Sequence, residues 1–157
     1  MSLYDLVNNA PVISEEFMDP HNELNKIITE DDIKRIFSTH FGLNIEVNDI
    51  NVYIRAFTHS SYIRNEYYEL NCKRDMSGGG IVPLQEYSCE TYEFVGDSIL
   101  KPIITSYLIK RYPYENEGFM TYLKIKLEDK TSYYNIAHKL GLGEYLLISK
   151  QTEYAMA

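Results

Sequence analysis

The stretch ETYEFVGDSIL, residues 90–100, combines three carboxylates with an otherwise largely apolar run. An ideal α-helix turns by about 100° per residue, which places Glu90, Glu93 and Asp97 in one sector roughly 60° wide. The apolar residues of this helix fall on the opposite side, where we expect a buried stripe made of Tyr92, Val95, Ile99 and Ile103. The stretch therefore predicts a helix with one apolar face and one wholly anionic face.

Two explanations fit the anionic face. Like charges three and four residues apart repel each other, at about 0.2–0.5 kcal/mol per exposed pair. We expect no Lys or Arg to compensate the three acids within this turn, so a hard divalent cation is one explanation. Mg²⁺ takes oxygen ligands, often one or two carboxylates with waters and substrate phosphates. The other explanation is a solvated face whose acids favour the helix N-terminus, and the spacing alone leaves both open.

The composition is that of an ordinary folded domain. The 157 residues are 45% hydrophobic and 24% charged, which suits one domain with a sizeable core. No apolar run approaches the roughly 18 residues of a membrane span, and the N-terminal residues lack the pattern of a secretory signal. Cys72 and Cys89 fit neither a disulfide framework nor a zinc site. We therefore expect a cytoplasmic protein with free thiols and no membrane partner.

The formal net charge of −8 argues against strong unaided binding to nucleic acid. It does not exclude a nuclease, because bound divalent metals reverse the sign of an acidic site.

Helical periodicity dominates the rest of the chain. Residues 1–28 have no clear period, and we interpret them as a partly docked N-terminal extension. Acids after Thr29 predict a helix start and Gly42 its stop. Further helices are expected over 50–62, over 89–111 with a kink or break near Ser98 to Pro102, over 119–130 and over 131–140.

Residues 63–88 read as a long loop insertion whose triple glycine, Gly78 to Gly80, is a flexible loop rather than a phosphate cradle. The end of the chain, residues 141–157, is short and undefined. No β alternation is convincing, so the fold class is all-α.

The motif around the three acids resembles the signature of the ribonuclease III family, Glu-x-x-Glu-Phe-Leu-Gly-Asp-Ser/Ala-x-Leu. The chain matches it throughout except that Val95 replaces the usual Leu. Three more segments resemble family motifs in the same order: AFTHSSY at 56–62, RYPYENEGFMTYLKIKL at 111–127 and NIAHKLGLGEYLLIS at 135–149. The loop ending in VPLQEYS also resembles ribonuclease III proteins of large DNA viruses.

This resemblance implies the ribonuclease III endonuclease-domain helical fold over residues 29–157. It implies a homodimer that cleaves double-stranded RNA by two-metal hydrolysis with Mg²⁺ or Mn²⁺. Glu93 and Asp97 would be metal ligands and Glu90 would support the site.

The resemblance also suggests roles for residues outside the acidic face. Phe94 is expected at the dimer interface, with packing in the core of its own chain as the alternative. Lys124, Lys126 and Lys130 could meet RNA phosphates or form a plain solvated face. His59 is expected to make a helix-end hydrogen bond rather than a catalytic contact.

The chain departs from the family pattern near its end. The family has a second acidic pair on a later helix, Asp-x-x-Glu-Ala-x-x-Gly, which Glu144 and Glu153 do not match. We therefore expect half a metal site, an incomplete C-terminus and no double-stranded RNA-binding domain in this chain. A fragment of a catalytic ribonuclease III and a natural short form both fit. A non-catalytic dimerisation or RNA-scaffolding module is the alternative to an enzyme.

Overall fold

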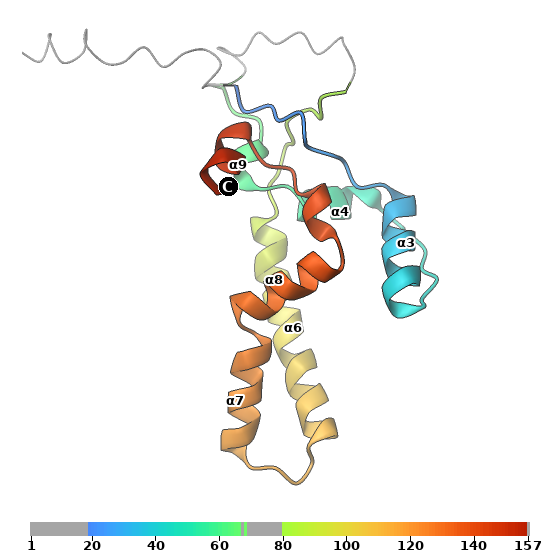
Figure 1. The fold of residues 1–157 in the computed structure, drawn as a ribbon, viewed down its shortest axis with the longest axis vertical. Coiled ribbons are helices and arrows are strands. Elements are labelled where there is room, and N and C mark those ends of the chain that lie inside the picture. The colour runs from blue at the N-terminus through green and yellow to red at the C-terminus, as the bar shows by residue number, and fades with distance from the viewer. Residues whose placement is uncertain (1–18, 67, 69–79, 157) are drawn as a thin grey trace, which may run out of the picture.

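The computed structural model describes residues 19–66, 68 and 80–156, which form a set of helices (Figure 1). In chain order the elements are α3 (Glu30–Phe41), α4 (Ile50–Ala56), η1 (Ser60–Tyr62), α6 (Glu90–Arg111), α7 (Glu117–Leu127), α8 (Lys130–Lys139), η3 (Leu142–Tyr145) and α9 (Lys150–Met156). The described residues form no strand, and only isolated bridges join Thr58 with Leu147 and Ile63 with Gln85. The predicted all-α class is confirmed.

Helix α3 begins at a capping box, where the sequence predicts its start. Thr29 Oγ1 accepts a hydrogen bond from the Asp32 amide, and Asp32 Oδ2 accepts one from the Thr29 amide, both over 3.2 Å. These bonds satisfy amides that have no partner inside the helix. The helix stops at Gly42, whose φ of 66° lies in the left-handed region that glycine adopts without strain. Both predicted boundaries are confirmed.

The hydrophobic core lies between α3, α4 and η3. Its buried centre consists of Ile28, Ile33, Ile36 and Tyr145. Apolar residues of α4 and of the residue after it pack against this centre, namely Ile50, Tyr53, Ile54 and Phe57. Burying one such side chain stabilises the fold by about 1.5–3 kcal/mol. We call residues 19–62 together with 141–153 the packed region.

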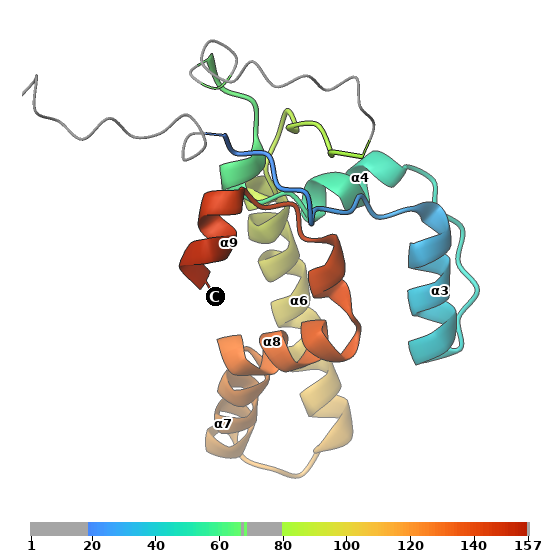
Figure 2. The ribbon, with the colours of Figure 1, turned by 45° about the horizontal axis from the view of Figure 1, so that its top comes forward.

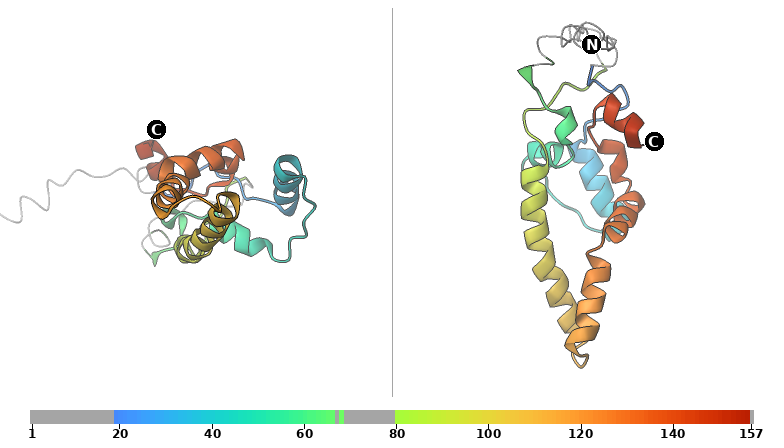
Figure 3. Two further views of the ribbon diagram at one scale, coloured as in Figure 1. Left: turned by 90° about the horizontal axis from the view of Figure 1, so that it is seen from below. Right: turned by 90° about the vertical axis from the view of Figure 1, so that its left-hand side faces the viewer.

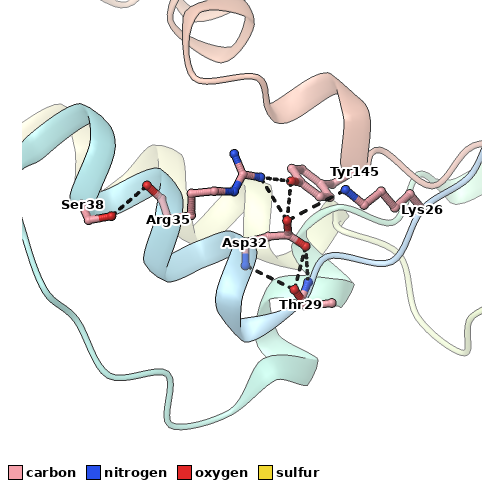
Figure 4. Close-up of polar contacts among 6 residues, drawn as sticks. All are labelled: Lys26, Thr29, Asp32, Arg35, Ser38 and Tyr145. Carbon is pink, nitrogen blue, oxygen red and sulfur yellow. Dashed lines mark hydrogen bonds and ion pairs between the residues drawn. The ribbon is translucent and has the colours of Figure 1, made fainter.

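A polar network fastens α3 to η3 within the packed region (Figure 4). Tyr145 Oη donates to Asp32 Oδ1 over 2.8 Å, and Arg35 Nη2 lies 3.0 Å from the same oxygen. Thr29 Oγ1 donates to the other carboxylate oxygen over 2.7 Å. Hydrogen bonds from Thr29, Tyr145 and Arg35 hold the pKa of Asp32 well below its ordinary value, against the opposing effect of burial.

The segment from residue 19 to residue 28 is fastened to the last residues of the described chain. Asn25 Nδ2 donates to the Ile148 carbonyl over 3.0 Å, and the Ile148 amide donates back to Asn25 Oδ1 over 3.2 Å. Asn22 Nδ2 donates to Glu153 Oε2 over 2.8 Å. Both asparagines are buried, so these bonds compensate polar groups that would otherwise lose their water. Residues 1–18 of the predicted extension lie outside the described part.

The expectation of an undefined end is wrong. Residues 142–145 form η3 and residues 150–156 form α9. Between them Leu147 and Ser149 are buried, and the Leu147 amide donates to the Phe57 carbonyl over 2.9 Å. These two helices could not be predicted from apolar periodicity, because neither exceeds seven residues and an apolar stripe does not repeat over so short a length.

Helix α6 is continuous over 22 residues and runs through Pro102. Proline has no amide hydrogen, so the helical bond to the Ser98 carbonyl is lost. In the same turn, the Ser98 hydroxyl donates a hydrogen bond to the Phe94 carbonyl over 2.9 Å. The expectation that the helix breaks and restarts near Pro102 is wrong.

Helices α6 and α7 form a long hairpin that extends away from the packed region, which we call the helix arm. Figure 2 shows the two helices joined by the turn over residues 112–116 at the far end of the arm, and the right-hand view of Figure 3 shows them diverging from this turn towards the packed region. The Tyr112 and Phe119 rings pack edge to face at this turn, 5.3 Å apart.

The stripe predicted to be buried on α6 is mostly exposed in this structure. Ile103 is 57% exposed, Val95 and Ile99 are exposed as well, and Tyr92 is half-buried. Leu108 is the buried residue of this helix. The periodicity correctly predicts a helix, but no described element covers this face.

The loop over residues 63–88 lies partly outside the described residues. Cys72, Gly78 and Gly79 fall in the part that is not described, so the expectations for them are not addressed. The last part of the loop is fastened to η1. The Gln85 amide donates to the Tyr62 carbonyl over 3.0 Å, and Tyr62 Oη donates to the Val82 carbonyl over 2.6 Å.

Candidate functional site

The three predicted acids occupy the first two turns of α6, and all three are exposed. Helix α6 has no side-chain cap at Cys89, so its first amides favour nearby negative charge. Ser88 Oγ donates to Glu90 Oε2 over 3.2 Å and holds that carboxylate at the helix start. Glu93 and Asp97 follow on the same face, one helical turn apart.

Asp97 has a partner that the sequence analysis did not assign. Lys101 Nζ lies 2.5 Å from Asp97 Oδ2, four residues further along α6. Hydrogen bonding to Asp97 raises the pKa of Lys101. The expectation that no basic residue compensates the acids is therefore wrong for Asp97. Both side chains are about half exposed, and exposed pairs of this kind contribute about 0.3–0.5 kcal/mol.

Two further polar groups approach this ion pair from α7 and α8. Glu128 follows the last residue of α7, and its Oε1 is buried without a hydrogen-bond partner among the described residues. The Tyr133 hydroxyl on α8 is likewise buried without a hydrogen-bond partner among the described residues. Burial, and then the negative charges of Glu128 and Asp97, raise the pKa of Tyr133. Asp97 and Lys101 of α6 thus interact electrostatically with Glu128 and Tyr133.

The donor chemistry of the acidic face fits a hard divalent cation. Glu93 and Asp97 offer carboxylate oxygens, and Mg²⁺ is commonly held by one or two carboxylates with waters. In the described part of the chain, no three His, Cys, Asp or Glu side chains converge as a metal-binding group. Two carboxylates alone would leave most of the coordination positions of such a cation to water and substrate.

The three lysines predicted to meet RNA lie in the last turn of α7 and at the start of α8. Lys124 lies 3.9 Å from Glu128 Oε1 and lines a pocket of about 550 Å³ between α6 and α7. Lys101 and Lys110 of α6 line the same pocket. Lys126 and Lys130 are exposed on α7 and at the start of α8.

Phe94 is 75% exposed. Its alternative role, packing within the core of its own chain, is therefore excluded in this structure. An aromatic ring this exposed, flanked by other exposed apolar residues of α6, is typical of an interaction surface.

His59 makes the helix-end hydrogen bond that the sequence analysis expected. It is the N-cap of η1, and its Nδ1 accepts a hydrogen bond from the Ser61 amide over 3.1 Å. Ser61 Oγ in turn accepts a hydrogen bond from the Ser149 amide over 3.0 Å. His59 therefore helps to join η1 to the C-terminal segment.

The comparisons with known proteins address the family directly. The family model for the ribonuclease III domain matches residues 90–156, which include the whole acidic face and the helix arm. This chain belongs to the ribonuclease III family. Within the described residues, no helix is long and apolar enough to span a membrane.

Individual relatives are a probable ribonuclease 3 of Acanthamoeba polyphaga mimivirus and a ribonuclease 3 of Borreliella afzelii. The first is 32% identical over 139 residues, which are 87% of this chain and 25% of that protein. The second is 32% identical over 112 residues, covering 71% of this chain and 39% of that protein. The chain thus spans about a quarter to two fifths of the length of these relatives.

A solved structure supports the fold. The nuclease domain of ribonuclease III from Campylobacter jejuni matches 78% of this chain and 69% of that chain, with a TM-score of 0.57 and 25% identity. That nuclease domain is described as showing structural flexibility in a region involved in dimer formation. The helical fold of a ribonuclease III nuclease domain, expected from the resemblance, is confirmed.

Proposed function

We propose that this chain is the catalytic part of an endoribonuclease of the ribonuclease III type, which hydrolyses phosphodiesters in double-stranded RNA inside the cell. The observation that carries the proposal is the exposed face of Glu90, Glu93 and Asp97 on α6, inside the region that matches the family model. The domain includes residues 19–28 as well as the expected 29–157, because Ile28 lies in the buried core and Asn25 is hydrogen-bonded to Ile148, and the loop over 63–88 is an insertion.

Glu93 and Asp97 hold a divalent cation, Mg²⁺ or Mn²⁺, and Glu90 supports them. A cation bound there supplies charge stabilisation for the phosphoryl oxygens and lowers the pKa of bound water. The hydroxyl of Ser88 fixes the orientation of Glu90 at the start of the helix. The Asp97 carboxylate must leave Lys101 to take a cation, and the exposure of both side chains makes that exchange inexpensive.

Lysines of the helix arm and of α8 bind the RNA backbone. Lys124, Lys126 and Lys130 are the proposed phosphate contacts, and the pocket that Lys124 shares with Lys110 supports the first of them. Because the whole chain is acidic, these local positive charges and the bound cation must together offset the repulsion of phosphates.

The functional unit is a homodimer with Phe94 at its interface. The exposed apolar residues on α6 support this, because a second copy would remove them from water. The related Campylobacter jejuni nuclease domain is described as having a dimer-forming region.

One observation favours the alternative, a non-catalytic dimerisation or RNA-scaffolding module. The ion pair between Asp97 and Lys101 neutralises one of the proposed ligands without a metal. A module that keeps the fold but not the chemistry would retain this pair as a local helix contact.

The test is cleavage of a long RNA duplex in Mn²⁺ by the product of the complete reading frame and by the 157-residue chain. Glu93→Gln and Asp97→Asn should abolish cleavage by the reading-frame product while the circular dichroism spectrum stays unchanged. Glu144→Gln is the matched control, because Glu144 is an exposed acid in η3 away from α6. Cleavage at the unmodified rate by Asp97→Asn would refute the proposed site on α6. No cleavage by the unmodified reading-frame product would refute the enzyme and leave the module.

A further inference from the structure

Arg55 of α4 lies between two tyrosine rings that come from another part of the chain. Its guanidinium carbon is 5.0 Å from the centroid of the Tyr87 ring and 4.5 Å from that of Tyr92. Arg55 Nε donates to the Ser88 carbonyl over 3.2 Å, which leaves the two terminal nitrogens of the guanidinium for other partners. Among the described residues, no carboxylate forms an ion pair with Arg55.

This stack forms one wall of a pocket of about 370 Å³, within the range of small-ligand sites. The Tyr87 ring is 56% exposed, so much of its surface is open to a ligand. Hydrogen bonding to Glu86 raises the pKa of Tyr87 above its ordinary value.

The other residues that line the pocket indicate whether it suits a phosphate or a base. Asp49, Asn51, Gln85 and Glu86 contribute carboxylates and amides to the same pocket. Two carboxylates beside one arginine repel a phosphate but accept hydrogen bonds from amino groups. A flat, neutral ring that carries an exocyclic amino group fits both the aromatic wall and the acceptors.

We propose that this pocket binds one unpaired RNA base, stacked on the face of the Tyr87 ring that Arg55 leaves open, with adenine favoured by its amino group. Unpaired bases are commonly bound by stacking on aromatic side chains and arginine planes, with hydrogen bonds to their edges. Carboxylates and amides are suitable partners for the amino groups of adenine and cytosine.

The pocket adjoins the acidic face of α6 through shared residues. Ser88 accepts from Arg55 with its carbonyl and donates to Glu90 with its hydroxyl. Tyr92 lies in the first turn of α6, on the face opposite to the acids. A nucleotide held here therefore lies near the start of α6, and only its origin in an RNA substrate rests on the proposed function.

The experiment is a binding titration of single-stranded RNA hexamers, followed by ligand-observed nuclear magnetic resonance in the presence of a chelator. Adenosine and inosine hexamers are compared on the unmodified chain, because they differ at the amino group of the base. The adenosine hexamer should bind several-fold more tightly, and Tyr87→Leu and Arg55→Lys should each weaken its binding about fivefold or more. Tyr114→Leu is the matched control, since Tyr114 is 100% exposed in the turn of the helix arm.

Equal binding of the two hexamers, equal binding by Tyr87→Leu, or no binding by the unmodified chain would each overturn the proposal. The comparison of hexamers needs no variant, so a misfolded variant cannot conceal the answer. Because the assay contains no metal and no duplex, its failure leaves the nuclease proposal standing. Failure of the cleavage assay likewise leaves this pocket standing.

Discussion

The packed region and the helix arm are built from similar apolar helices but bury them very differently. In the packed region Ile33 is 2% exposed, and it lies in a centre formed by residues far apart in the chain. In the helix arm, Phe94 and Ile103 are largely exposed to solvent. An apolar stripe therefore predicts a helix reliably, but its burial depends on whether another element reaches it.

Polar anchors account for much of this difference. Asp32 and Tyr145 join α3 to η3, and Asn25 joins the segment from residue 19 to residue 28 to Ile148. These contacts bring distant segments together and exclude water from the apolar centre. Among the described residues, none anchors the exposed face of α6 in this way over most of its length, which leaves that face for a partner.

The largest effect is expected from truncating the core of the packed region. Ile33→Ala should lower the free energy of unfolding by about 2–5 kcal/mol, because it leaves a cavity that the core only partly fills. Ile125→Ala in α7 is the matched control, since Ile125 is 63% exposed and should change the stability by about 0.5 kcal/mol or less. Urea denaturation followed by circular dichroism measures both. Equal losses of unfolding free energy in the two variants would contradict the difference in burial between the packed region and the helix arm.

Asp32→Asn should destabilise the packed region by about 1–3 kcal/mol, because the amide cannot replace the carboxylate for Thr29, Arg35 and Tyr145. The folded pKa of Asp32 is lowered, so its contribution is present above the unfolded pKa of about 3.9 and is lost as the pH falls below it.

Between pH 7 and pH 2, the midpoint temperature of thermal unfolding should therefore fall more steeply for the unmodified chain than for Asp32→Asn. Asp31→Asn is the control, because Asp31 is an exposed acid of the same helix turn. Parallel pH profiles for the unmodified chain and Asp32→Asn would contradict the network in Figure 4.

In the helix arm the expected effect falls on association rather than on folding. Phe94→Ser should weaken self-association by about 1–2 kcal/mol, because an exposed aromatic ring contributes only once a second copy covers it. Sedimentation equilibrium measures the dimer, and urea denaturation checks that the stability is unchanged. Tyr122→Ser, an exposed aromatic residue on α7, is the control. If the unmodified chain stays monomeric at high concentration, α6 is not a dimer interface.

The smallest effect is expected from Lys101→Met. Losing the ion pair should free Asp97 and tighten Mn²⁺ binding by about 0.3–0.5 kcal/mol, roughly twofold. Lys110→Met on the same helix is the control, because it removes an equal charge away from Asp97. Weaker Mn²⁺ binding by Lys101→Met than by Lys110→Met would show that Lys101 supports the site instead of competing for it.

Local patterns were sufficient to predict much of the fold. The capping box at Thr29 and the stop at Gly42 involve neighbours in the sequence, and both boundaries are confirmed. The acidic face of α6 depends only on helical spacing, so its geometry was predictable too. The pair of Asp97 with Lys101 is also local, at four residues, and could have been predicted by the same rule.

Contacts between distant segments could not be predicted. The approach of Glu128 and Tyr133 to Asp97 depends on how α7 and α8 pack beside α6. The placement of Arg55 between Tyr87 and Tyr92 likewise depends on how residues 81–89 return to α4. No periodicity encodes either arrangement.

The central claim, that the acidic face of α6 holds a divalent cation, is tested most directly by titrating Mn²⁺ into the 157-residue chain and measuring free Mn²⁺ by electron paramagnetic resonance. Asp97→Asn should lose about tenfold or more in affinity, whereas Asp31→Asn should bind like the unmodified chain. If Asp97→Asn binds Mn²⁺ as tightly as the unmodified chain, the cation lies elsewhere and the acidic face is a solvated surface.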